Sequence, residues 1–374
     1  MVVAHNDSRV TGRLFRREPS DVQCRLYRWF WMMAYLGVFA MKDFLPERFS
    51  RDAGTLAEMI EQNNFDEGSY GAMAMIYSHV PGPLLPLLPA IICIPSLWII
   101  LGYVRSYPVM MLMPILLMPY LIMNFMNPTK ETLVALMILA VYHISQSRLT
   151  TFRAILLVLM LYGTYAAFIR SYYALIAIFF IALLFLRHMP RAIGAIAVLL
   201  GLAAMLMLPE DFYRALQGSR DESAFYMAYL GEDTVRTYFF NLLPPDNLGS
   251  FLVNTFWGLL VMFVPFFVAQ SFNEVLMMVN VFMYCGMVLA ILRYRGGAGQ
   301  LPAYLFMGHI LTQAQFEPDL GSYVRHFSCV LVMISPGLLY MFRNRPAEVI
   351  VAEETAQLQA AGGAPADTVR TTVR

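Results

Sequence analysis

Residues able to carry acid–base chemistry gather in one short segment, 317–326, which reads EPDLGSYVRH. Glu317, Asp319 and His326 are candidate catalytic residues, because a carboxylate or an imidazole can act as a general base. Arg325 could bind phosphate oxygens bidentately. A solvated turn with an interfacial anchor is the alternative interpretation. We favour a functional role, because Arg and His beside long apolar runs are costly without one.

A second segment, FIRSYY at residues 168–173, places Arg170 between two apolar runs. An arginine there can hold a diphosphate, and neighbouring tyrosine rings offer faces on which sugars stack. An ordinary interfacial arginine beside an aromatic belt would give the same pattern. The aromatic candidates for substrate binding are Tyr172, Tyr173 and Tyr323.

The polar segment 42–71 follows the first apolar run and is rich in acids. Arg51 and Asp52 lie together in it, and the adjacent acids Asp66 and Glu67 come just before a new apolar stretch. A base or a substrate ligand could occupy such a position, so all four are candidate substrate-binding residues. An acidic outer segment also follows from membrane topology alone.

A longer polar segment, 209–249, separates two later apolar runs. Its 41 residues exceed what a connection needs, and long loops are often functional or lid-like. Arg236 is its candidate substrate-binding residue. Among the histidines outside 317–326, His309 is the hardest to assign to structure, because it lies inside an apolar run.

The elements that position these residues follow from composition. Of 374 residues, 59% are hydrophobic and only 14% are charged, whereas soluble domains carry about 25% charged residues. Apolar runs of about 20 residues span the hydrocarbon core of a bilayer, and only a helix satisfies its own backbone there. The sequence therefore predicts an all-α, polytopic integral membrane protein with about 10–11 transmembrane helices.

The predicted spans lie between short polar breaks. They are residues 26–41, 84–104, 108–126, 131–146, 153–169, 172–187, 192–208, 250–271, 275–292, 301–316 and 326–342. Residues 1–28 contain six arginines against three acids, whereas 42–71 contains three basic residues against seven acids. The positive-inside bias therefore predicts a cytoplasmic N-terminus, with 42–71 and 209–249 as outer loops.

The same bias predicts an irregular element late in the chain. Two full crossings between 250 and 292 would put Arg293 outside, so we interpret 250–271 as re-entrant or broken, which makes 317–325 an exposed outer loop. The predicted organisation is an Arg-rich cytoplasmic segment 1–25, a membrane domain 26–343 and a disordered tail 344–374, whose composition loses the apolar pattern.

Several classes of function are disfavoured. A net charge of +1 provides no basic field for nucleic acid. The four cysteines form no CxxC pair, which argues against a disulfide framework and against a zinc site. The chain has no Walker loop, no HExxH and no GxSxG, the motifs of ATP-driven transporters, many metalloproteases and many hydrolases.

The chain resembles the bacterial O-antigen and exopolysaccharide polymerases, the Wzy-type proteins of the inner membrane. The resemblance is carried by the helix layout over residues 25–343, the acidic segment after the first helix, FIRSYY and EPDLGSYVRH. It implies polymerisation of lipid-linked oligosaccharide repeat units into a surface polysaccharide on the outer face of the inner membrane. The substrate would carry undecaprenyl diphosphate, membrane lipids would surround it, and a chain-length regulator and a flippase would be partners. No cofactor, metal or nucleotide sugar would be needed.

The resemblance also implies roles for individual residues. Arg170 and Arg325 would neutralise the diphosphate leaving group, and Glu317, Asp319 or His326 would take the proton of the attacking hydroxyl. The sequence departs from the family in one respect. The family's pair of Arg-rich outer loops is not evident, because 209–249 contains only three arginines.

Three alternatives remain open. A membrane glycosyltransferase that uses a polyprenyl-phosphate sugar donor would explain the adjacent acids Asp66 and Glu67. A glycan ligase would transfer finished polymer to another acceptor. A polysaccharide transporter or flippase would do no covalent chemistry, and it would place its polar residues along one pathway near the bilayer midplane.

Overall fold

The computed structural model describes residues 18–46, 50–65, 68–229, 237–264 and 271–341. Over these ranges the chain is all-α, as predicted, with no strand and an isolated β-bridge between Tyr238 and Asp319. The predicted tail 344–374 and residues 1–17 of the predicted N-terminal segment lie outside the described residues.

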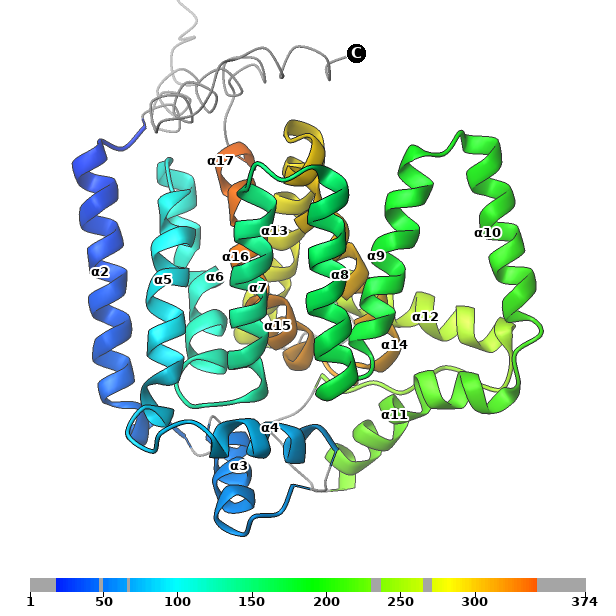
Figure 1. Ribbon diagram of the computed structural model, residues 1–374, viewed down its shortest axis with the longest axis horizontal. Coiled ribbons are helices and arrows are strands. Elements are labelled where there is room, and N and C mark those ends of the chain that lie inside the picture. Colours follow the sequence, from blue (N-terminus) through cyan, green and yellow to red (C-terminus); the bar gives the residue numbers. More distant parts are fainter. Residues whose placement is uncertain (1–17, 47–49, 66–67, 230–236, 265–270, 342–374) are drawn as a thin grey trace, which may run out of the picture.

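The longer helices stand side by side in a bundle (Figure 1). Their bounds are α2 Asp21–Ala40, α5 Leu88–Gly102, α6 Tyr107–Asn124, α7 Lys130–Gln146, α8 Thr151–Phe168, α9 Tyr173–His188, α10 Arg191–Met205, α13 Phe272–Tyr294 and α14 Leu301–Phe316. The short elements at the C-terminal end are α15 Leu320–Cys329, α16 Leu331–Ile334, η6 Ser335–Gly337 and α17 Leu338–Met341.

Three helices cover one end of the bundle, the lower end in Figure 1. They are α3 Arg51–Glu61, α4 Gly68–Ser78 and α11 Glu210–Tyr229. The described chain begins at the opposite end with α2 and finishes there with α17 (Figure 1). The helix α12, Leu248–Phe263, runs across the direction of the upright helices. Short 3₁₀ turns connect other helices: η1 Lys42–Phe44, η3 Leu85–Leu87 and η5 Gly297–Gln300.

Four helical stretches in the described ranges are long and apolar enough to cross a membrane. They are Leu85–Gly102, Tyr107–Asn124, Thr151–Phe168 and Phe272–Tyr294, and the number rises to six if each of two bent helix pairs is one span. The about 10–11 transmembrane helices expected from the sequence stay a prediction. Other apolar helices, such as Tyr173–His188 and Leu248–Phe263, are 16 residues long, short of the roughly 20 that span a bilayer.

Three segments expected to be loops are largely helical. The segment 42–71 contains α3, and 209–249 contains the 20-residue α11, which bends from α10 by 96°. The segment 317–325, expected as an exposed loop, is mostly the buried helix α15. Its start is fixed by Asp319, whose side chain accepts a hydrogen bond from the Ser322 backbone N–H at 2.9 Å. An N-cap of this kind satisfies a backbone donor that would otherwise be unpaired.

The helix α14 lies at the centre of the packing, against α9, α11, α12 and α13. Where α14 packs against α9, Gly308 faces the backbone of Ile176. A Cβ atom at Gly308 would lie 2.8 Å from the Ile176 carbonyl oxygen, so the contact depends on glycine. The last turn of α14 thereby reaches the turn between α8 and α9, which brings Glu317 towards Arg170.

Candidate functional site

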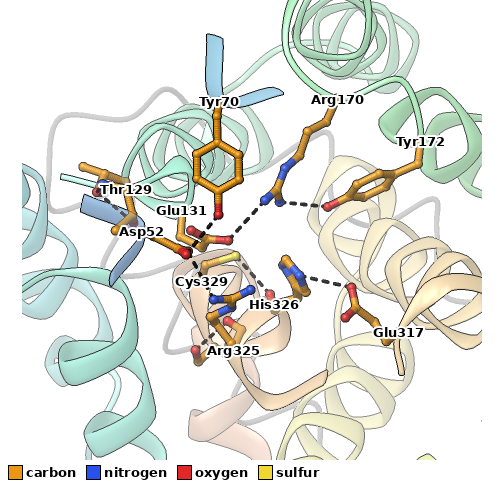
Figure 2. Close-up of polar contacts among 12 residues, drawn as sticks. Asp52, Tyr70, Thr129, Glu131, Arg170, Tyr172, Glu317, Arg325, His326 and Cys329 are labelled. Carbon is orange, nitrogen blue, oxygen red and sulfur yellow. Dashed lines mark hydrogen bonds and ion pairs between the residues drawn. The ribbon is translucent and has the colours of Figure 1, made fainter. Parts of the chain in front are cut away.

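A pocket of about 670 Å³ opens at the lower end of the bundle, where segments far apart in the sequence meet. Its ionisable lining residues come from the α8–α9 turn, the end of α14 and α15, and serines from α4, α11 and α15 add hydroxyls. The polar lining residues are Ser69, Arg170, Ser171, Tyr172, Ser223, Glu317, Ser322, Arg325 and His326. Figure 2 shows the charged side chains of this site turned towards one another.

The turn after α8 holds Arg170 in place. The backbone N–H of Arg170 donates to the Tyr165 carbonyl at 3.1 Å, and its own carbonyl accepts from the Tyr173 N–H at 3.0 Å. The Arg170 side chain is only 8% exposed, and its Nη1 donates to the Tyr172 hydroxyl at 2.9 Å. Burial raises the pKa of Tyr172 to about 12, so the phenol keeps its proton and can donate it to a bound oxygen.

Glu317 and His326 form the acid–base pair of the pocket. His326 Nε2 lies 3.1 Å from Glu317 Oε1, and both side chains are largely buried. Burial raises the pKa of Glu317, but its contact with His326 and the charge of Arg325 lower it more, so its net pKa lies below the usual value. An ionised Glu317 fixes the proton of a neutral imidazole on Nε2, which leaves Nδ1 as the nitrogen that can accept a proton.

Arg325 connects the pocket to the covering helices. Its Nη1 lies 3.4 Å from Asp52 Oδ2 on α3, and the Tyr70 hydroxyl on α4 donates to the other Asp52 oxygen at 2.9 Å. The Lys130 ammonium lies over the Tyr70 ring, 3.6 Å from its centroid. Asp52 therefore lies at the site, one contact away from the pocket lining.

Sequence reasoning missed Glu131, the buried acid of the site. Its side chain is 1% exposed, and its Oε1 lies 3.5 Å from Arg170 Nη2. It also interacts electrostatically with Arg325, and Figure 2 shows its carboxylate between the two guanidinium groups. A signal was present, because Glu131 is the first residue of a predicted span, where an acid at the start of an apolar run needs a reason.

Asp319, Tyr173 and Tyr323 do not line the pocket. Asp319 caps α15 and is buried, which raises the pKa of its carboxyl. Tyr173 packs against His309, whose Nε2 lies 2.7 Å from the Tyr162 hydroxyl inside the bundle. Tyr323 stacks on Phe239 and Phe327. These residues lie outside the pocket lining, so a direct contact with substrate stays a prediction for them.

Asp66, Glu67 and Arg236 lie outside the described residues, and Arg51 is the first residue of α3. Within the described ranges, His, Cys, Asp and Glu side chains form no group of three that could hold a metal ion.

The site as a whole combines two guanidinium groups, a carboxylate–imidazole pair and several hydroxyls around one accessible space. Such an arrangement can bind an anionic group and move a proton beside it. Comparison with protein-family models, with curated proteins and with solved structures found no match to this chain.

Proposed function

We propose that this protein is an integral membrane glycosyltransferase that polymerises lipid-linked oligosaccharide repeat units into a surface polysaccharide. The observation that carries the proposal is the meeting of Arg170, Arg325 and the Glu317–His326 pair at one pocket. The sequence separates Arg170 from the other three by about 150 residues. Their convergence matches what transfer of a glycan from a polyprenyl diphosphate requires.

In the proposed reaction, a hydroxyl of the newly supplied repeat unit attacks the anomeric carbon of the nascent glycan. The bond from that carbon to the diphosphate oxygen breaks as the new glycosidic bond forms, and the polyprenyl diphosphate leaves with the electron pair. His326 takes the hydroxyl proton, and Glu317 stabilises the resulting imidazolium. Arg170 and Arg325 neutralise the charge that develops on the diphosphate.

The position of the pocket supports a membrane setting. It lies at the end of the bundle covered by α3, α4 and α11, opposite the start of α2 (Figure 1). With the Arg-rich N-terminus in the cytoplasm, this end would face the extracytoplasmic side, where lipid-linked repeat units are polymerised in the proposed scheme. Apolar pocket residues such as Phe168 and Ile169 lie beside the polar ones, as an amphiphilic substrate requires.

The test is genetic complementation in the organism that encodes the protein. The gene is deleted, and full-length wild type, Arg325→Ala, His326→Ala or Arg214→Ala is returned. Arg214 is the matched control, an exposed arginine of α11 that pairs with Glu210 and Asp246. We expect wild type and Arg214→Ala to restore a ladder of polymer lengths. The two pocket variants should leave glycan of a single repeat unit.

The glycan profile separates the alternatives. Polymer that accumulates on its lipid carrier would indicate a ligase. A complete loss of glycan would favour a single-sugar transferase or a flippase. A deletion strain with an unchanged surface glycan would end the case for polymerisation.

A further inference from the structure

Glu131 is a buried carboxylate of the site for which the proposed reaction has no use. It lies in the first turn of α7, and helix capping there is done by Thr129 and Thr132. Its ion pair with Arg170 joins two side chains that are 1% and 8% exposed. Solvent therefore screens this pair far less than it screens the partly exposed pair of Asp52 and Arg325.

The electrostatics of the site give this carboxylate a task. Arg170 and Arg325 approach the same pocket, and like charges in a poorly screened environment repel. Glu131 interacts with both of them, and its carboxylate lies between them in Figure 2. A buried anion in that position holds the two guanidinium groups together and limits their rotamers before any ligand arrives.

We propose that Glu131 is a positioning residue, which sets the spacing and direction of Arg170 and Arg325 so that both bind one diphosphate. The inference rests on the proposed function in one respect, the prenyl diphosphate ligand. Glu131 itself does not contact the ligand, because it is absent from the pocket lining. The two arginines use their remaining donors for the phosphate oxygens, which accept bidentate contacts from a guanidinium.

A counter-ion without a positioning role predicts the opposite result. If Glu131 only balances charge, Glu131→Gln makes the pocket more positive and strengthens the binding of an anion. If Glu131 positions the arginines, the same substitution releases their side chains and weakens binding. The sign of the change in affinity therefore separates the two roles.

The experiment uses the full-length protein in nanodiscs, with farnesyl diphosphate as the probe and farnesol as the uncharged control. We expect Glu131→Gln to raise the Kd for farnesyl diphosphate on the order of tenfold, the lower end of the loss seen when partners that orient metal ligands are removed. The matched control is Glu58→Gln, on the exposed face of α3, which should bind as wild type does. Glu131→Asp should fall between wild type and Glu131→Gln.

Each outcome decides the inference. Binding by Glu131→Gln that equals or exceeds wild type overturns it and leaves the proposed function intact. If Glu131→Gln does not fold, Glu131→Asp decides, because it keeps the charge and withdraws the carboxylate by one methylene. Wild-type affinity in that variant also overturns the inference. No binding of farnesyl diphosphate by the wild type rejects both proposals. Weaker binding by the variants in a protein whose deletion leaves glycan unchanged supports the inference and rejects the polymerase.

Discussion

Arg170 and Arg220 are both buried, yet their donors meet different kinds of acceptor. Arg170 is paired with the carboxylate of Glu131 and lines the pocket. Arg220, on α11, is fully buried, and it donates to the Asn241 side-chain oxygen at 3.0 Å and to the Ala314 carbonyl. Its guanidinium lies over the Phe239 ring, 4.9 Å from the centroid.

Neutral amides extend the cluster around Arg220. Gln217 Nε2 donates to Gln315 Oε1 at 2.8 Å, and Asn254 Nδ2 donates to Gln217 Oε1 at 3.1 Å. These bonds join α11, α12 and α14. These partners are neutral groups that are already hydrogen-bonded within the protein, so an incoming anion would have to break several buried hydrogen bonds. The comparison indicates that the Arg220 cluster holds α11 in place, whereas Arg170 and Arg325 line the pocket where we propose that a ligand binds.

The largest effect that the comparison predicts is on catalysis. His326→Ala removes the proposed base, and general-base catalysis contributes about 10²–10⁴-fold to a rate. We expect a loss of that order in glycan transfer from a lipid-linked donor, measured with purified protein. The thermal midpoint should also fall, because the largely buried Glu317 loses its partner, so the rate is measured at a temperature where the variant is folded. A variant that retains more than a tenth of the wild-type rate would remove His326 from the reaction.

Arg220→Met should act on stability instead. It removes a buried cation and leaves carbonyl and amide acceptors without a donor, at a cost of about 3 kcal/mol in the free energy of unfolding. Equilibrium unfolding in mixed detergent measures the loss. The control is Arg214→Met, where exposed ion pairs contribute less than about 1 kcal/mol. Equal stability of the two variants would contradict a structural role for the Arg220 cluster.

Gly258→Ala tests the packing of the same cluster with a single methyl group. A Cβ atom at Gly258 would collide with the Ala314 carbonyl oxygen and approach the Arg220 guanidinium. Overpacking of this kind costs about 1–3 kcal/mol. The control is Gly37→Ala on α2, where the added methyl meets nothing within 4 Å. If both alanine variants unfold at the same denaturant concentration, α12 and α14 have room to separate.

Part of the site and the fold class could be predicted from the sequence. Arg170, Arg325 and His326 stood out because they interrupt apolar runs, and the all-α class followed from those runs. The pairings could not be predicted, since Asp52 and Arg325 are 273 residues apart and nothing local links them. The helix α15, found where the sequence analysis expects an exposed loop, did have a local signal. Asp is a preferred N-cap residue, so Asp319 is itself a signal for a helix that begins at residue 320.

The partners of the buried charged residues could not be predicted, because the membrane setting removes the usual contrast between buried and exposed helix faces. In an apolar chain, hydrophobic periodicity does not separate a helix that faces lipid from one that faces protein. The buried α14 and the almost wholly exposed α10 are both mainly apolar. Glu131 and Arg220 therefore gave no sign of which partners they meet, because those partners lie on other helices.

The smallest effect concerns Asp52, the acid of the site that is partly exposed. Its pair with Arg325 joins side chains that are 26% and 32% exposed, so Asp52→Asn should cost less than about 1 kcal/mol in stability. The substitution leaves Arg325 less neutralised, and farnesyl diphosphate should bind up to about fivefold more tightly, equivalent to about 1 kcal/mol. The change should shrink in high salt, because exposed charges are screened.

The direction of that change completes the comparison. A carboxylate that only balances charge gives tighter anion binding when it is neutralised, whereas Glu131→Gln should give weaker binding. Titrating both variants with farnesyl diphosphate therefore compares Asp52, an acid that only balances charge, with Glu131, an acid that positions the arginines. Weaker binding by Asp52→Asn would mean that the α3 carboxylate also orients Arg325, and that the covering helices belong to the binding site itself.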